Sequence, residues 1–170
     1  KLAGLIEERA DEIARLESRD NGKPIRETSV QVKSVARAFY YFAGLADKIT
    51  GHVIPLERSS IFDFAVHEPL GVIVAITAWN SPFQFLATKL APALAAGNTV
   101  VVKPSELASV TTLLFGQLVH EAGFPPGVVN VVTGYGDTVG TALTTDPRVA
   151  KVTVTGGVAT GLKVAAATAR

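Results

Sequence analysis

The chain has 170 residues, enough for one domain or a large part of a bigger one. Its formal net charge is +1 and its Lys and Arg residues are spread along the sequence, which gives no electrostatic indication of a surface for nucleic acid or an anionic membrane. Hydrophobic residues make up 48%, mostly Ala and Val, which suits the buried strands of a parallel sheet, and no apolar run reaches the roughly 20 residues that span a bilayer. The absence of cysteine excludes disulfides and thiolate metal sites and favours a cytoplasmic location.

Residues 1–50 carry two amphipathic patterns that predict a helical hairpin packed on a neighbouring sheet. Apolar side chains recur at helical spacing ahead of Asp20-Asn21-Gly22, which ends the first helix. The second helix begins either at Pro24, as a first-turn proline, or at the capping pattern Thr28-x-x-Gln31. Its apolar stripe extends to Ile49.

Residues 51–70 predict a β-hairpin. Strands are expected at residues 52–56 and 61–67, joined by the polar segment Glu57-Arg58-Ser59-Ser60. Apolar and polar residues alternate in the second strand, which is typical of a sheet with one face covered. We therefore interpret the hairpin as an arm, and as a candidate oligomerisation element.

From residue 71 onward, apolar runs alternate with helical patterns. The apolar runs lie at 71–76, 98–102, 128–132 and 151–155, and the helical stretches lie near 82–96, 109–122, 137–144 and 158–169. Four strand–helix units in this order predict an α/β fold with a doubly wound parallel, Rossmann-like sheet. We assign residues 71–170 to an incomplete dinucleotide-binding domain, preceded by the helical hairpin and the β-hairpin arm.

The sequence lacks methionine, even at position 1, and stops within an Ala-rich helical pattern. We therefore expect it to be part of a longer polypeptide.

Polar residues follow the first two apolar runs, where strands of a parallel sheet end and ligands bind. In Thr77-Ala78-Trp79-Asn80-Ser81-Pro82, the Asn80 amide can donate two hydrogen bonds to a developing oxyanion, or it can cap the next helix. Trp79 can be a core aromatic. In Lys103-Pro104-Ser105-Glu106, the ammonium and carboxylate can hold ribose hydroxyls, or they can form a solvated surface pair.

Two glycine-rich segments follow later strands. Gly134-Tyr135-Gly136-Asp137-Thr138-Val139-Gly140 resembles G-x-G-x-x-G with one extra residue, and turn chemistry explains it equally well. Thr155-Gly156-Gly157 precedes a helix whose first N–H groups can hold a pyrophosphate, although it also suits an ordinary tight turn. The histidines His52, His67 and His120 are isolated from one another and from any carboxylate cluster, so we expect structural or surface roles for them and no metal site.

Together these motifs resemble the aldehyde dehydrogenase superfamily over the whole chain. The matching segments are Asp20-Asn21-Gly22-Lys23-Pro24, Glu68-Pro69-Leu70-Gly71-Val72, Trp79-Asn80-x-Pro82, Ala91-Pro92-Ala93-Leu94-Ala95-Ala96-Gly97-Asn98, Lys103-Pro104-Ser105-Glu106, Gly123-Phe124-Pro125-Pro126-Gly127-Val128-Val129-Asn130 and Thr155-Gly156. The ordered set is far more specific than any one of its members.

The resemblance implies a role for each matching residue. Asn80 is the amide that helps to hold the oxyanion of a thiohemiacetal. The expected cofactor-binding residues are Ile76, Thr77, Ala78 and Trp79 at a strand end, Lys103, Ser105 and Glu106 at the adenosine ribose, Gly136 and Gly140 beside the adenine, and Thr155, Gly156 and Gly157 at the pyrophosphate. The family usually has proline at the position of Ala78 and serine at the position of Gly157. Without that serine, the side-chain contact to the pyrophosphate is lost, and backbone N–H groups must hold the phosphate instead.

The resemblance also implies what these residues lack. The nucleophilic cysteine and the general-base glutamate of the family lie beyond the position of Arg170, so we expect the isolated chain to be inactive and to bind NAD weakly or not at all. The parent protein is expected to oxidise a small-molecule aldehyde to a carboxylic acid with NAD, or with NADP, as a homodimer or homotetramer. The alternatives are a non-catalytic dinucleotide-binding or assembly module and an acylating, CoA-dependent relative.

Overall fold

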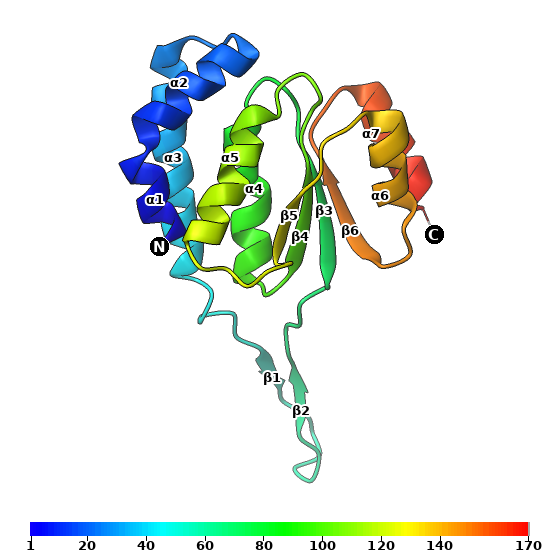
Figure 1. The fold of residues 1–170 in the computed structure, drawn as a ribbon. Coiled ribbons are helices and arrows are strands. Elements are labelled where there is room, and N and C mark those ends of the chain that lie inside the picture. Colours follow the sequence, from blue (N-terminus) through cyan, green and yellow to red (C-terminus); the bar gives the residue numbers. More distant parts are fainter. Residues whose placement is uncertain (170) are drawn as a thin grey trace.

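A parallel four-stranded sheet in the order β5-β4-β3-β6 lies at the centre of the computed structural model, which describes residues 1–169 (Figure 1). The strands are β3 (Val72–Ile76), β4 (Thr99–Lys103), β5 (Val129–Val131) and β6 (Val149–Val154). The chain steps outward from β3 through β4 to β5, then returns to pair β6 with the other side of β3. This order confirms the predicted doubly wound parallel sheet.

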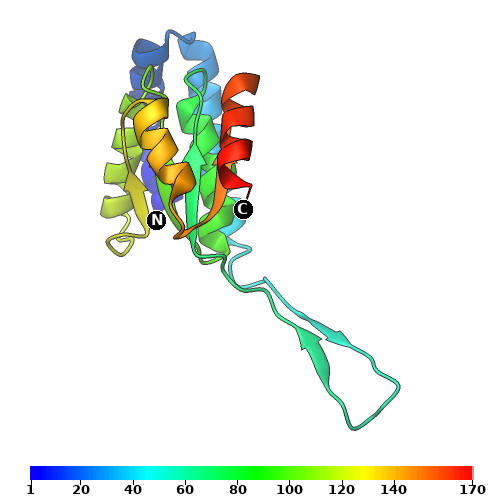
Figure 2. The same ribbon diagram turned by 90° about the vertical axis from the view of Figure 1, so that its right-hand side faces the viewer.

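Helices cover both faces of the sheet (Figures 1 and 2). One face carries α4 (Pro82–Ala95) and α5 (Val110–Glu121), and the other carries α6 (Thr141–Thr145) and α7 (Val158–Thr168). The crossover from β5 to β6 differs from the expected single helix, because a π-helical turn, η1 (Gly136–Gly140), precedes α6. All four predicted strand–helix units are present.

The N-terminal helices form a further layer outside α4 and α5. The first predicted helix is interrupted at Arg9 (φ −104°, ψ 18°), giving α1 (Leu2–Glu8) and α2 (Ala10–Asn21). The break lets Ile6 and Ile13, both fully buried, face the same core. The helix α3 (Ile25–Ala43) begins directly after Pro24. It ends before Ile49, which is exposed, so the apolar stripe predicted for this helix was too long.

The hairpin extends away from the layered part of the molecule (Figure 2). Its strands, β1 (His52–Ile54) and β2 (Asp63–Ala65), pair antiparallel and are shorter than predicted. Within the described residues no element covers this apolar face, since Phe62 and Phe64 are 72% and 56% exposed. Alternation shows that a strand has two faces, but not which element covers them. The pairing also places the rings of His52 and His67 6.3 Å apart, so these two histidines are not isolated from each other.

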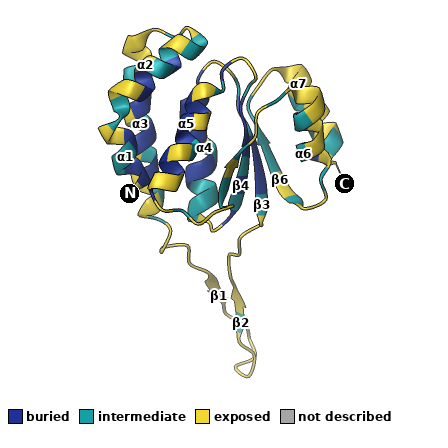
Figure 3. Ribbon diagram, viewed as in Figure 1, coloured by how far each residue is buried: buried dark blue, intermediate teal, exposed yellow. Residues whose placement is uncertain are grey.

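The buried core lies between the N-terminal helices, α4, α5 and the central strands (Figure 3). Phe115 is fully buried and packs against Phe39 and Phe83, with ring centroids 5.6 and 6.0 Å away. By contrast, α7 contributes no buried residue. Among the described helices, none has the length and apolar character needed to cross a membrane.

Candidate functional site

The carboxyl ends of β3, β4 and β6 are held side by side by backbone hydrogen bonds that continue past the strands. The Thr77 N–H donates to the Lys103 carbonyl oxygen at 3.1 Å, and the Thr155 N–H donates to the Ile76 carbonyl oxygen at 3.0 Å. Three loops therefore leave the sheet from one edge. This is the side of the switch point in strand order at which open α/β sheets bind ligands.

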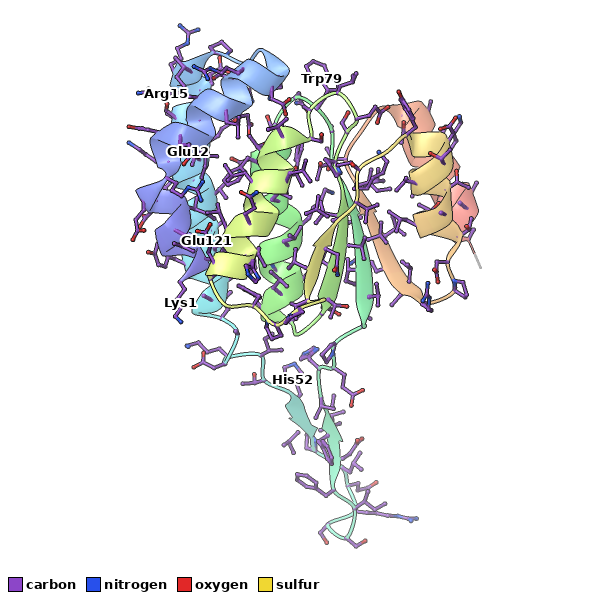
Figure 4. All side chains as sticks on the ribbon, in the orientation of Figure 1. Lys1, Glu12, Arg15, His52, Trp79 and Glu121 are labelled. Atoms are coloured by element: carbon purple, nitrogen blue, oxygen red, sulfur yellow. The ribbon has the colours of Figure 1, made fainter. Side chains whose placement is uncertain are left out.

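A cleft of about 940 Å³ opens at this edge. Every residue predicted for the site lines it: Ile76, Thr77, Ala78, Trp79, Asn80, Lys103, Ser105, Glu106, Gly136, Gly140, Thr155, Gly156 and Gly157. Figure 4 labels Trp79 beyond the upper end of the sheet, and its side chain is 53% exposed, so the core-aromatic interpretation is wrong. The cleft has the size of a small-molecule or cofactor site.

Asn80 does not cap α4. Ser81 occupies the N-cap position without a side-chain cap, and the Phe83 N–H of the first turn instead donates to Glu17 Oε2 at 3.2 Å. Within the described residues, the Asn80 side chain lines the cleft and makes no hydrogen bond. Its two amide N–H groups therefore remain available to a ligand.

Lys103 is not part of a solvated surface pair, because its side chain is only 4% exposed. Its Nζ donates to the Pro104 carbonyl oxygen at 3.0 Å and approaches Glu106 Oε2 at 3.5 Å. The Glu106 side chain is 42% exposed, so the carboxylate reaches solvent beside a buried ammonium. An ammonium has three donors, so this pair can still donate to and accept from neighbouring hydroxyl groups.

Thr77 places a buried hydroxyl at the cleft. The residue is 2% exposed, and its Oγ1 has no hydrogen-bond partner among the described residues. An unsatisfied buried hydroxyl costs free energy unless something else bonds to it. The oxygen is also closed to solvent, so in this structure it is not a contact for a ligand in the cleft.

The glycines leave open space along the cleft. A β-carbon at Gly157 would meet no atom within 4 Å, and one at Gly156 would make only ordinary contact with Thr160 at 3.9 Å. Gly157 has φ −66° and ψ 155°, which any residue adopts, so a tight turn does not explain it. Because Gly157 directly precedes α7, a phosphate could approach the first N–H groups of that helix.

The earlier glycine segment forms the π-helical turn. Both Val139 and Gly140 donate their N–H groups to the Tyr135 carbonyl oxygen, at 3.0 and 3.3 Å. A β-carbon at Gly140 would lie 3.9 Å from the Lys103 stem. At Gly134, φ is +147°, a conformation that favours glycine, so turn chemistry explains that position.

Sequence reasoning missed part of the cleft lining. The additional residues are Phe85, Leu107, Asp137, Thr141, Thr144, Thr160, Lys163, Val164 and Ala167. Four of them, from Thr160 to Ala167, recur at helical spacing on α7, so periodicity counted from Gly157 could have found them. Lys163 adds a second ammonium group. No cluster of potential metal ligands occurs among residues 1–169.

Comparison with known proteins gives consistent matches. The model of the aldehyde dehydrogenase family matches residues 1–170. A (Z)-2-((N-methylformamido)methylene)-5-hydroxybutyrolactone dehydrogenase from Acinetobacter baylyi is 51% identical over 157 residues, which is 92% of this chain and 32% of that protein.

Solved structures agree with the sequence matches. PnpE in complex with nicotinamide adenine dinucleotide is 47% identical with a TM-score of 0.95, over 98% of this chain and 34% of that one. PnpE from Pseudomonas sp. WBC-3 is 46% identical with the same TM-score and coverage. A point mutant of betaine aldehyde dehydrogenase from Staphylococcus aureus, in complex with NAD+ and with a modified cysteine, is 39% identical with a TM-score of 0.96, over 99% and 34%. This chain therefore spans about a third of the length of these relatives.

Proposed function

Because this chain belongs to the aldehyde dehydrogenase family, we propose that its cleft binds NAD in an enzyme that oxidises an aldehyde to a carboxylic acid. The chain contains no cysteine, so the nucleophile that forms the thiohemiacetal comes from outside these 170 residues. The observation that carries the proposal is that the site residues which the resemblance implies, distant in sequence, line one cleft.

Two features of the cleft support NAD as its ligand. Lys103 and Glu106 offer a donor and an acceptor for ribose hydroxyls, and Gly157 leaves open space where a phosphate could approach the start of α7. Two of the solved relatives bind NAD. When bound, NAD supplies the hydride acceptor. The Glu106 carboxylate would repel the 2′-phosphate of NADP, so we expect NAD to be preferred.

Asn80 is the residue of this chain that acts on the substrate. Its amide carries no charge at any pH and has no competing hydrogen bond within the described residues, so it can donate to the oxygen of the carbonyl under attack. The negative charge that develops on that oxygen strengthens the hydrogen bond in the transition state. We assign Asn80 to oxyanion stabilisation.

The test measures NADH formation from a panel of aldehydes by the enzyme that contains this chain. Asn80→Ala should lower kcat by about 10²- to 10³-fold with the KM for NAD nearly unchanged. Lys103→Met should instead raise the KM for NAD, and Glu106→Gln should narrow the preference for NAD over NADP. Absence of aldehyde-dependent NADH formation would refute the proposed function.

The proposed assembly is a homodimer or homotetramer that uses the hairpin arm. Apolar side chains on the arm are exposed, among them Val53 at 65% and Phe62 at 72%. Phe62→Ser together with Phe64→Ser should reduce the mass measured by light scattering; an unchanged mass would exclude the arm. The cytoplasmic location stays a prediction that cell fractionation would check.

A further inference from the structure

The backbone around Asn80 is tied to the C-terminal end of α2, far from it in sequence. Asn21 Nδ2 lies 3.3 Å from the Trp79 carbonyl oxygen and 3.5 Å from the Asn80 carbonyl oxygen. The Asn21 side chain is itself oriented, because its Oδ1 accepts the Lys23 N–H at 3.0 Å. One amide thus closes the turn after α2 and reaches the loop that carries the proposed oxyanion donor.

A second connection runs through Lys23. Its Nζ donates to Ser81 Oγ at 2.6 Å and to Gln31 Oε1 at 3.0 Å. Ser81 is 6% exposed, and its hydroxyl donates to the Asn80 carbonyl oxygen at 2.7 Å. The Asn80 carbonyl therefore accepts from Asn21 directly and is linked to Lys23 through one hydroxyl.

The third connection fixes the start of α4. Glu17 is 1% exposed and accepts the Phe83 N–H at 3.2 Å, which replaces the side-chain cap that Ser81 does not provide. The segment from Trp79 to Phe83 is thus attached to α2 and the turn after it by side chains from Glu17, Asn21 and Lys23.

We propose that Asn21 and Lys23 are positioning residues for Asn80: they hold its backbone so that its amide points into the cleft. This inference rests on the proposed role of Asn80. The Asn80 side chain has no hydrogen bond of its own within the described residues, so the hydrogen bonds to its backbone carbonyl locate its Cα and thereby the space that its amide can reach. Displacements of about 1 Å at a reacting group can cost as much as 10²-fold in rate.

The kinetic test compares Asn21→Ala with Asn80→Ala and with the double variant in the enzyme that contains this chain. Asn21→Ala should lower kcat about tenfold and leave the KM for NAD within about twofold, since only the amide is misplaced. The double variant should be no slower than Asn80→Ala, because Asn21 acts through Asn80. Asn21→Asp keeps the acceptor for the Lys23 N–H but loses the donor, so it should not restore kcat.

Ser18→Ala is the matched control. Ser18 lies on the same helix end, and its hydroxyl bonds to Thr28 Oγ1 at 3.0 Å without reaching the Asn80 loop. We expect its kcat to be unchanged. If Asn21→Ala proves too unstable to assay, Lys23→Met tests the same inference through Ser81, with the same expected direction.

A spectroscopic measurement is independent of activity. The side-chain amide resonance of Asn80, identified by its loss in Asn80→Ala, should shift in Asn21→Ala and stay in place in Ser18→Ala. Unchanged kcat in both Asn21→Ala and Lys23→Met, or multiplicative losses in the double variant, would overturn the positioning role while leaving the proposed function intact. A normal kcat in Asn80→Ala would overturn the assignment of Asn80 and the positioning role together.

Discussion

The two faces of the sheet are packed very differently. On the α4 and α5 side, the sheet, these two helices and the N-terminal helices outside them bury whole side chains, including Phe83, Leu86 and Phe115. On the α6 and α7 side, the helices form a single layer, and Val158 and Leu162 of α7 are 82% and 67% exposed. The cleft lies where these two sides meet, with one wall from each.

This difference in packing means that the α4 and α5 side contributes most to the stability of the fold, whereas α7 mainly provides a wall of the cleft. The wall built by β3, β4 and α4 is anchored in the core, and Lys103 at the end of β4 is buried and hydrogen-bonded to the Pro104 carbonyl oxygen. The wall built by α7 has few buried contacts, and regions of that kind open locally at low free-energy cost. We therefore expect substitutions on the packed side to change the free energy of unfolding and substitutions on α7 to leave it nearly unchanged.

The largest change in the free energy of unfolding should come from substituting Phe115, which connects the N-terminal helices to α4. Phe115→Ala removes its ring contacts with Phe39 and Phe83 and leaves a cavity, so the free energy of unfolding should fall by about 3–5 kcal/mol. Phe115→Leu should cost less and keeps the experiment measurable if the alanine variant does not fold. Urea denaturation gives both values; a loss below 1 kcal/mol for the alanine variant would contradict the packing.

Glu17 should make the packed side sensitive to pH. Burial raises the pKa of its carboxyl group from 4.5 to about 7, with Asp20 adding to the rise; the Phe83 N–H, the Lys23 ammonium and the nearby Thr111 hydroxyl oppose it. Because the folded-state pKa is higher than the unfolded one, this contribution to stability is complete below pH 4.5. The contribution of Glu17 is lost as the pH rises through 7, and the free energy of unfolding then falls by on the order of 3 kcal/mol.

Glu17→Gln should abolish that decrease, because glutamine does not titrate and can still accept the Phe83 N–H. The measurement is the free energy of unfolding between pH 4.5 and 8. Glu12→Gln is the control: its partner Arg9 lowers the pKa of Glu12, so its own contribution changes below this window. Equal pH dependence in the original protein and Glu17→Gln would contradict the assignment.

A smaller effect is expected at Asn98, which is 8% exposed. Its side chain accepts the Gly71 N–H at 3.0 Å and donates to the Ala93 carbonyl oxygen at 3.1 Å, which joins the end of α4 to the start of β3. Asn98→Ala should cost about 1–3 kcal/mol by thermal or urea unfolding. Asn130→Ala, which removes one exposed hydrogen bond to Gly127, should cost far less.

The smallest change in the free energy of unfolding should come from substituting Leu162. Its side chain is mostly exposed on α7, so Leu162→Ala should change the free energy of unfolding by less than about 0.5 kcal/mol. A loss comparable to that of Phe115→Leu would mean that the two sides do not differ as described.

Where the local sequence pattern determines the structure, the sequence was sufficient to predict it. The apolar runs before Thr77 and Lys103 predicted parallel strands, and strands of a parallel sheet end at a common edge, so the grouping of site residues followed. The individual roles of Asn80 and Lys103 needed the three-dimensional structure. A helix cap and a surface pair were reasonable from sequence, and only the burial of Lys103 and the contact from Glu17 excluded them.

Where tertiary contacts decide, the sequence was insufficient. Nothing local marks Arg9 as a helix break, because the reason is the common burial of residues on both sides of it. The attachment of Asn21 to the Asn80 loop also depends on segments that are distant in sequence. The π-helical turn at Gly136 was not predicted either, although its hydrogen bonds to the Tyr135 carbonyl oxygen are local.

The pairing of β6 with β3 has a consequence for how the molecule folds. Val72 is paired with Val149, whereas β3 and β4 pair over a much shorter stretch of chain. Closing a long loop costs more conformational entropy, so β6 should join the sheet after β4, and the cleft should be among the last features to form. A dinucleotide that binds there would then stabilise the completed fold relative to the unfolded chain.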